Sequence, residues 1–452
     1  MTSSPDASAA RPIWCVTAEG WPALAETLPA AAAAYARATG FSAKPGSHCV
    51  LPGADGSLAG VVLGIDPKGD PFAPGKLADA LPEGDYRFAA APPDPLLAAL
   101  AWRLAAYRFA RYRDRPAPAA VLATPEGVDA AEVERIAAAV AAGRDLVNTP
   151  ANDLGPAEIE AAARGLAARA GAACTVVSGE ALERDFPMIA AVGRASDRAP
   201  RLIDLTWGDP GAPKVTLVGK GVAFDTGGLD IKPSAAMLLM KKDMAGAAAA
   251  LAAAEMAMGA GLRLRLRVLV PAVENAISGS AFRPGDVLRS RRGLTVEIGN
   301  TDAEGRLILA DALALADEES PDLLVDFATL TGAARVALGP DLPALFTEDD
   351  GLAAEMAEIG RAVNDPVWRL PLWAPYASLL DSKVADVNHV SGGPFAGAVT
   401  AALFLRRFAT AAKAHVHLDL YGWNPSTKPG RPEGGEVQTA RLVYALLRRR
   451  YA

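Results

Sequence analysis

The sequence carries VGKGVAFDTGGLDIKPS at residues 218–234, MKKDMAGAAA at 240–249 and NTDAEGR at 300–306. Among glycine, alanine and other apolar residues, these pieces hold four acids and three bases: Asp225, Asp243, Asp302, Glu304, Lys220, Lys232 and Arg306. Charged side chains are normally spread over a solvated surface, without such glycine-rich and apolar surroundings. The three pieces therefore indicate a carboxylate-rich metal site with cationic groups beside it.

Strand-like and helix-like segments alternate around these pieces. Strands are predicted at 173–179, 201–207, 214–220, 262–272, 294–299, 323–331 and 414–420, and helices at 240–258, 307–316 and 398–412. Such alternation predicts an α/β fold with a mostly parallel, twisted sheet flanked by helices. Ligands of these sheets bind beyond the carboxyl ends of strands. Lys220 and Asp225 follow one predicted strand, and Asp302 and Glu304 follow another.

The length of 452 residues exceeds what one hydrophobic core usually supports, so two domains are expected. Residues 1–128 predict a small N-terminal α/β domain, with a polar, disordered tail over 1–12. Residues 129–452 predict a larger catalytic domain. Apolar residues at helical spacing indicate that it opens with a linker helix over 130–147.

Composition excludes several classes of protein. A formal net charge of −7 argues against nucleic-acid binding, which needs a basic domain or stripe. The three cysteines are far apart in the sequence and show no zinc-site spacing, which favours a reduced, cytoplasmic protein. The N-terminus lacks the apolar stretch of a signal peptide, and no apolar run is long enough to span a bilayer. Neither a membrane nor a nucleic acid is expected as a partner.

The NTDAEGR piece allows two interpretations. In an extended segment, Asp302 and Glu304 would point to the same side, where two carboxylates repel unless a cation lies between them. Alternatively, Thr301 and Glu304 fit a capping box that opens the helix predicted from Leu307. The other two pieces favour the first interpretation.

The glycine-rich piece is not a phosphate-binding loop, because both GxxxxGK[ST] and GxGxxG are absent. Its glycines instead permit positive φ angles and close backbone approach. Lys220 and Lys232 also have an ordinary interpretation as surface lysines. Asp243 lies near the start of a largely apolar helix, and its neighbours Lys241 and Lys242 do not face it at that spacing. Its expected partner is therefore a metal or a charge from another segment.

The donor types constrain the metal. The sequence has four histidines and no HExxH motif, and His415 and His417 on one strand face suit structural roles. A carboxylate site favours Mn²⁺, Zn²⁺ or Mg²⁺. Four acids and a lysine are too many ligands for one ion with an open position. Two ions that share a bridging carboxylate would use them all and activate a water.

Taken together, the three pieces resemble the leucine aminopeptidase family of two-metal cytosolic peptidases. The resemblance rests on GKG-x₃-D-x-GG-x₂-IKPS, MK-x-DM-x-GAA and NTDAEGR followed by LIL. Further similarity occurs at 145–153, 283–287, 326–333, 397–405 and 417–423. The first 125 residues show no recognisable similarity to the family.

This resemblance implies that two divalent ions are bound by Lys220, Asp225, Asp243, Asp302 and Glu304. Asp225 and Glu304 would bridge toward both ions. Lys232 would stabilise the oxyanion, and Arg306 would hold a bicarbonate that carries the proton. The implied reaction removes the N-terminal residue from a peptide that has a free α-amine. Relatives form hexamers, so a homohexamer is expected.

Four residues match positions of the family's first side-chain pocket: Met240, Thr329, Gly332 and Tyr421. Tyr421 stands where relatives usually have a small residue, so the resemblance supports aminopeptidase chemistry better than a preference for leucine. Two rival functions remain at this point. One is another dimetal amidase, and the other is a non-catalytic binding protein on the same fold.

Overall fold

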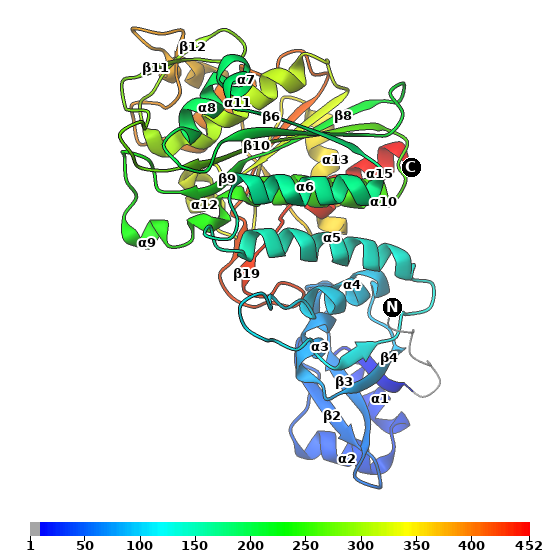
Figure 1. The fold of residues 1–452 in the computed structure, drawn as a ribbon. Coiled ribbons are helices and arrows are strands. Elements are labelled where there is room, and N and C mark those ends of the chain that lie inside the picture. Colours follow the sequence, from blue (N-terminus) through cyan, green and yellow to red (C-terminus); the bar gives the residue numbers. More distant parts are fainter. Residues whose placement is uncertain (1–9) are drawn as a thin grey trace. The chain divides into compact units, whose positions relative to one another are not determined.

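The computed structural model describes residues 10–452, which divide into two compact units (Figure 1). The first contains the chain up to Ala141 together with Ser426–Glu433, and the second contains Ala142–Pro425 and Gly434–Ala452. The division falls inside helix α5 (Ala130–Asn148). Most of the predicted tail, residues 1–9, lies outside the described residues, but Arg11 and Pro12 already belong to strand β1 (Arg11–Val16). Burial of Ile13 and Cys15 in this strand outweighs the polar character of the preceding sequence.

The first unit is a five-stranded sheet with the order β2-β3-β1-β4-β5, covered on both faces. Successive side chains of one strand point to opposite faces of the sheet, so this strand contributes to a hydrophobic core on each face. Val61 and Leu63 pack with Trp102 in one core, and Val62 packs with Trp21 in the other. Its remaining elements are α1 (Trp21–Thr27), α2 (Ala30–Ala38), β2 (His48–Pro52), β3 (Leu58–Gly64), α3 (Leu77–Ala80), β4 (Gly84–Ala90), α4 (Pro95–Ala105) and β5 (Ala120–Leu122).

The second unit contains a nine-stranded sheet with the order β15-β14-β17-β13-β8-β10-β7-β6, in which β9 also pairs with β10. The central strands β17, β13, β8 and β10 run parallel to one another, which confirms the predicted mostly parallel sheet. The strands are β6 (Ala173–Ser178), β7 (Arg201–Trp207), β8 (Lys214–Gly219), β9 (Gly221–Asp225), β10 (Arg265–Asn275), β13 (Leu323–Ala328), β14 (Ala344–Phe346), β15 (Trp368–Arg369) and β17 (His415–Asp419).

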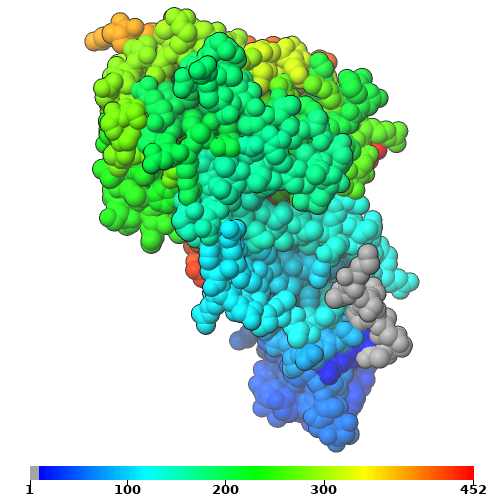
Figure 2. Space-filling model, in the orientation of Figure 1, coloured from blue at the N-terminus to red at the C-terminus, as the bar shows by residue number. Residues whose placement is uncertain are grey.

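Helices cover both faces of this sheet (Figure 1). One layer contains α6 (Pro156–Ala170), α10 (Ala245–Gly259) and α15 (Ala440–Tyr451), with α13 (Asp350–Ala362) beside α15. The other contains α7 (Glu180–Asp185), α8 (Pro187–Gly193), α11 (Glu304–Asp317) and α14 (Gly397–Arg406). Short elements complete the unit: α9 (Ser234–Met237), α12 (Gly332–Leu338), β11 (Val287–Arg289), β12 (Thr295–Glu297), β16 (Val387–Asn388), β18 (Trp423–Asn424) and β19 (Gly434–Gly435). Residues of the middle of the chain, green in Figure 2, form much of the visible surface of this unit.

Helix α10 lies against the strands because its residues are small. It is buried on nearly all sides, and a Cβ atom at Gly246 would lie only 2.2 Å from the carbonyl oxygen of Phe327. Among the described residues, no helix is long and apolar enough to cross a membrane.

Two local expectations were wrong. The predicted strand at 294–299 forms β12, which pairs with β11 and β16 in a separate three-stranded sheet rather than in the main one. A short alternating segment shows that one face is buried, but it does not identify the partner strand. The helix predicted over 240–258 begins instead with a 3₁₀ turn, Met240–Met244, before α10.

Candidate metal centre

Lys220 enters the site directly after β8. Its backbone N–H donates to the carbonyl oxygen of Phe327 at 2.9 Å, which extends the pairing of β8 with β13. Its buried Nζ atom lies 2.8 Å from Asp243 Oδ2 and 3.0 Å from Glu304 Oε1, and it donates to the carbonyl oxygen of Thr329 at 2.9 Å. Asp243 therefore pairs with a charge from another segment, as the sequence predicts.

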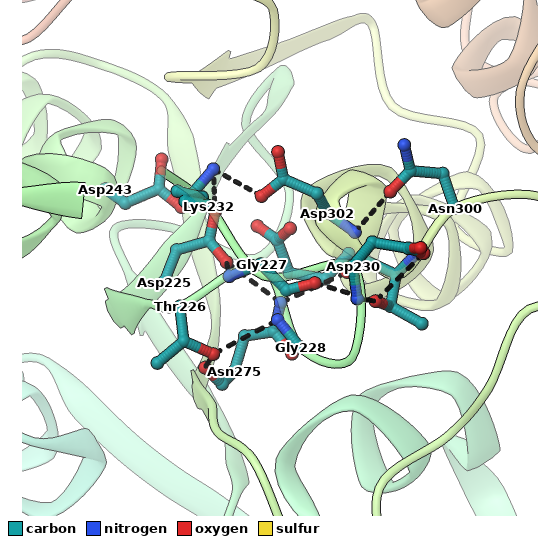
Figure 3. Close-up of polar contacts among 12 residues, drawn as sticks. Asp225, Thr226, Gly227, Gly228, Asp230, Lys232, Asp243, Asn275, Asn300 and Asp302 are labelled. Atoms are coloured by element: carbon teal, nitrogen blue, oxygen red, sulfur yellow. Dashed lines mark hydrogen bonds and ion pairs between the residues drawn. The ribbon is translucent and has the colours of Figure 1, made fainter. Parts of the chain in front are cut away.

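Asp225 ends β9 and is fixed by the glycine turn that follows. Its Oδ1 atom accepts hydrogen bonds from Gly227 N and Asn275 Nδ2, both at 2.8 Å (Figure 3). Its Oδ2 atom faces Lys232 Nζ at 2.7 Å, and Lys232 also contacts Asp302. Gly227 has a φ angle of +89°, and a Cβ atom there would lie 2.5 Å from the carbonyl oxygen of Asp230, so this position requires glycine.

The NTDAEGR piece adopts neither conformation considered from sequence. Thr301–Ala303 form a 3₁₀ turn capped by Asn300, whose side chain accepts from Asp302 N at 2.7 Å. Glu304 is then the first residue of α11. The capping box is absent, since Thr301 Oγ1 donates to the carbonyl oxygen of Gly227 at 2.7 Å. Asp302 and Glu304 are thus brought together by a turn and a helix start, not by an extended segment.

The structure brings the carboxylates together from three segments of the chain. Asp225, Asp302 and Glu304 each present an oxygen atom, and these atoms lie within 4.8 Å of one another. Asp243 is connected to this group by Lys220, whose Nζ atom contacts both Asp243 and Glu304. Figure 3 shows Asp225, Asp243 and Asp302 around Lys232, with Asn300 beyond Asp302.

Burial and mutual repulsion shift the pKa values of the charged groups in this cluster. Burial, followed by the charge of Asp225, raises the pKa of Glu304 to about 8 and that of Asp302 to about 6. Burial alone would lower the pKa of Lys220, but Asp243 and Glu304 raise it above its usual range. Three oxygens accept no well-formed hydrogen bond, although each lies within ion-pair distance of a lysine: Asp243 Oδ2, Asp302 Oδ1 and Glu304 Oε1. Carboxylate oxygens that converge in this way suit a hard divalent cation.

Arg306 lies two residues beyond Glu304 in α11. It is buried, which lowers its pKa to about 10, and its Nη1 atom donates to the carbonyl oxygen of His389 at 2.7 Å. Its Nε atom has no hydrogen-bond partner among the described residues.

The four predicted pocket residues lie on separate segments. Met240 begins the 3₁₀ turn that carries Asp243, and Gly332 begins α12. Thr329 Oγ1 donates to Asp243 Oδ1 at 2.7 Å. The ring of Tyr421 lies beside Lys242 and Arg335.

Sequence reasoning missed the residues that brace these segments. Asn275 Nδ2 also approaches the carbonyl oxygen of Thr301 at 3.1 Å, and Asp230 Oδ2 accepts from Thr301 N at 2.7 Å. His389 Nε2 lies 2.9 Å from the carbonyl oxygen of Asn300. Asn275 ends strand β10, but the predicted strand stops at residue 272, so no sequence pattern distinguished it. For Asp230, Thr301 and His389 as well, the sequence contains no pattern that distinguishes a residue supporting the metal site from an ordinary polar residue.

An α/β unit that presents this cluster of carboxylates, lysines and an arginine defines a metal-dependent hydrolase. The family model described as "Cytosol aminopeptidase family, catalytic domain" matches residues 141–447. The model described as "M17 aminopeptidase, N-terminal domain" matches residues 12–125, so the expectation that the first 125 residues lack similarity was wrong. Residues 12–125 are therefore similar to the family's N-terminal domain, although they contain no short motif that reveals the similarity.

Individual relatives agree with these matches. The crystal structure of cytosol aminopeptidase from Coxiella burnetii is 45% identical, with a TM-score of 0.96 over 99% of both chains. The bottromycin maturation enzyme BotP in complex with Mn is 37% identical, with a TM-score of 0.87 over 98% of this chain and 99% of that chain. The probable cytosol aminopeptidase of Syntrophotalea carbinolica is 44% identical over 71% of this chain and 66% of its own length.

The chain therefore belongs to the cytosol aminopeptidase family. It is a metallopeptidase that hydrolyses the N-terminal residues of peptides.

Proposed function

We propose that this aminopeptidase binds two divalent ions through Lys220, Asp225, Asp243, Asp302 and Glu304. The observation that carries the proposal is the convergence of the Asp225, Asp302 and Glu304 oxygens within 4.8 Å, with Lys220 beside them. Asp225 and Glu304 would contribute to both ions. Mn²⁺ and Zn²⁺ suit these donors, with Mg²⁺ as a third candidate, and the BotP structure in complex with Mn supports Mn²⁺.

When bound, the ions would supply Lewis acidity and an activated water. Lys232 would donate to the oxyanion that develops on the scissile carbonyl. Lys220 would bind as a neutral amine, so metal loading must release its proton. Arg306 is held by His389 and keeps a buried, unsatisfied Nε–H. This donor favours a small anion such as bicarbonate, which would take up and return the proton of the reaction.

The substrates would be peptides with a free N-terminal amine, and the enzyme would act in the cytoplasm. We expect a homohexamer, and large apolar side chains that are exposed within one segment support a contact between subunits: Trp368, Trp373, Leu379, Val384 and Phe395. Such exposure is typical of contacts between subunits. Light scattering on the purified protein tests the assembly, and a monomeric mass would contradict it.

The experiment that tests the function compares metal-stripped protein with protein restored by Mn²⁺ or Zn²⁺ on a panel of aminoacyl-arylamides. We expect restored hydrolysis, and we expect Asp243→Asn to lose both a bound ion and activity. Asp197→Asn removes an exposed acid from the same unit and is the matched control. Metal binding without hydrolysis of any free-amine substrate would contradict the proposal and favour a binding protein on this fold.

Gly305 offers a more selective test of the lysine ligand. A Cβ atom at Gly305 would lie 2.4 Å from Lys220 Cε and 2.7 Å from its Nζ atom. Gly305→Ala should therefore displace the lysine and weaken metal binding by roughly tenfold to a hundredfold. Competition with a chromophoric chelator measures the affinity.

Gly165→Ala in helix α6 is the matched control for this substitution. The nearest atom to a Cβ there is Arg169 Nη1, at 3.6 Å. This variant should keep the metal affinity and gain about 0.5–1 kcal/mol of stability from helix propensity. Equal metal affinities in the two variants would exclude Lys220 from the ligand set.

A further inference from the structure

Two cationic side chains beside the metal centre form no ion pair with any of the described residues. Lys242, which is 5% exposed, places Nζ 4.4 Å from the centroid of the Tyr421 ring. Arg335 of α12 places its guanidinium carbon 5.7 Å from the same centroid. In the part of the chain that the structure describes, the side chains of Lys242 and Arg335 form no hydrogen bond and no ion pair. The ring attracts each cation, but the two like charges repel each other, and a carboxylate between buried Lys242 and exposed Arg335 would offset that repulsion.

Burial lowers the pKa of Lys242 to about 8, although the charges of Asp243 and Asp419 oppose that shift, and neither acid forms an ion pair with Lys242 among the described residues. Asp243 uses Oδ1 to accept from Thr329, and its Oδ2 faces Lys220. Asp419 Oδ1 accepts from the backbone N–H groups of Leu330 and Thr331, and its Oδ2 accepts from Thr331 Oγ1 at 2.6 Å. Both carboxylates are therefore engaged elsewhere.

The cluster lies where the first side chain of a substrate is expected. Arg335 Nη2 lies 4.0 Å from the position that a Cβ atom at Gly332 would take. A Cβ atom at Gly422, the residue after Tyr421, would lie 3.1 Å from Thr329 Cγ2. Thr329 in turn binds Asp243. Three predicted pocket residues thus connect the two cations with a proposed metal ligand.

The ring is held in place by its backbone. Tyr421 N and Gly422 N both donate to Gln438 Oε1 at 3.0 Å, and Gln438 Nε2 donates to the carbonyl oxygen of Pro340 at 2.8 Å. Pro340 closely follows α12, which carries Arg335. This connection fixes Tyr421 and α12 relative to each other, so the cluster is organised before a ligand arrives.

We propose that Lys242, Arg335 and Tyr421 bind the side-chain carboxylate of an acidic first residue, so that the enzyme favours N-terminal glutamate or aspartate over their amides. The inference rests on the proposed aminopeptidase function and adds the class of substrate. A carboxylate would supply the missing counter-charge, and Arg335 offers it a paired set of N–H donors.

The test compares kcat/KM for glutamyl-arylamide and glutaminyl-arylamide in one enzyme preparation. These substrates have nearly the same shape and no C-terminal carboxylate, so a preference must come from the side chain. We expect the wild type to favour the glutamyl substrate about tenfold, because a hydrogen bond to a charged group contributes roughly that factor or more. The preference should decrease at high salt. Glutamate should also inhibit leucyl-arylamide hydrolysis more strongly than glutamine.

Variants locate the source of the preference. Arg335→Gln and Lys242→Gln should each reduce the ratio of glutamyl to glutaminyl hydrolysis several-fold, and Arg335→Lys should restore part of it. The ratio within one variant cancels any loss of metal or of folded protein. Arg263→Gln is the matched control, because Arg263 is exposed and follows the far end of α10 from Asp243. Its ratio should equal that of the wild type.

Each outcome separates this inference from the proposed function. Hydrolysis of leucyl-arylamide with no glutamyl preference, or with a preference that Arg335→Gln leaves intact, would overturn the inference alone. A preference confined to dipeptides would assign the cluster to the C-terminal carboxylate instead, and would also overturn it. Failure to hydrolyse any arylamide would overturn the proposed function itself.

Discussion

Replacing Lys232 with alanine is expected to lower kcat by a factor of roughly a hundred to a thousand without loss of metal. Lys232 Nζ lies 2.7 Å from Asp225 Oδ2 and also contacts Asp302, and its side chain is only 13% exposed. Bound ions would neutralise these acids, which leaves the ammonium free to donate to the oxyanion. Loss of one such preorganised donor costs this factor in other hydrolases.

The measurement pairs steady-state kinetics on leucyl-arylamide with the metal content per subunit. Lys383→Ala removes an exposed lysine of the same unit and should leave kcat unchanged. A decrease of less than tenfold in Lys232→Ala, with both ions bound, would show that Lys232 is not the oxyanion donor. Loss of an ion from this variant would instead assign Lys232 to the structure of the centre.

The second large effect is expected on stability, at the buried pair of Arg144 and Glu436. Arg144 Nη2 lies 2.7 Å from Glu436 Oε2, and the side chains are 1% and 10% exposed. Asn424 donates to the same carboxylate oxygen at 3.0 Å. Arg144→Met would leave Glu436 buried without its cation, which should lower the free energy of unfolding by about 3–5 kcal/mol. Urea unfolding measures this difference.

Two further variants test the explanation. The double variant Arg144→Met with Glu436→Gln should recover much of the loss, because no uncompensated charge remains. Arg449→Met breaks the exposed pair with Glu358 and should cost less than about 1 kcal/mol. If Arg144→Met and Arg449→Met had equal effects, the buried pair would contribute no more than a surface pair.

The same pair predicts a response to acid. Burial alone would raise the pKa of Glu436, but Arg144 and Asn424 lower it to about 2. The unfolded chain binds this proton near pH 4.3. The stabilisation is therefore fully present above that pH and is lost as the pH falls toward 2. In urea unfolding between pH 5 and pH 3, the double variant should lose less stability than the wild type.

Periodicity predicted the main sheet because its strands and helices are long enough to show it. The strands β6, β7, β8, β10, β13 and β17 lie where the alternation of segments placed them. By contrast, β12 has only three residues, and its pairing with β11 and β16 depends on contacts that one strand does not specify. The predicted start of α10 was also wrong, because the preceding 3₁₀ turn depends on tertiary contacts of Asp243.

The candidate centre was predicted for a partly wrong reason. Asp302 and Glu304 do lie near Asp225, but a capped 3₁₀ turn brings them there and not an extended segment. The supports of this turn, Asn275 and Asp230, come from other segments and have no local pattern. No role was predicted for Lys242 and Arg335, because a lysine or arginine side chain is normally exposed to solvent. Only the three-dimensional packing shows that both lie beside one aromatic ring.

The ion pairs of Lys220 and Lys232 have a consequence for the newly made protein. Their ammonium groups neutralise Asp225, Asp243 and Glu304 within the chain itself. Small zinc domains differ, since they fold only when the metal arrives. If the proposed ions bind here, the two lysines would oppose the repulsion among the acids before metal arrives, so folding should depend on metal less than it does in those domains.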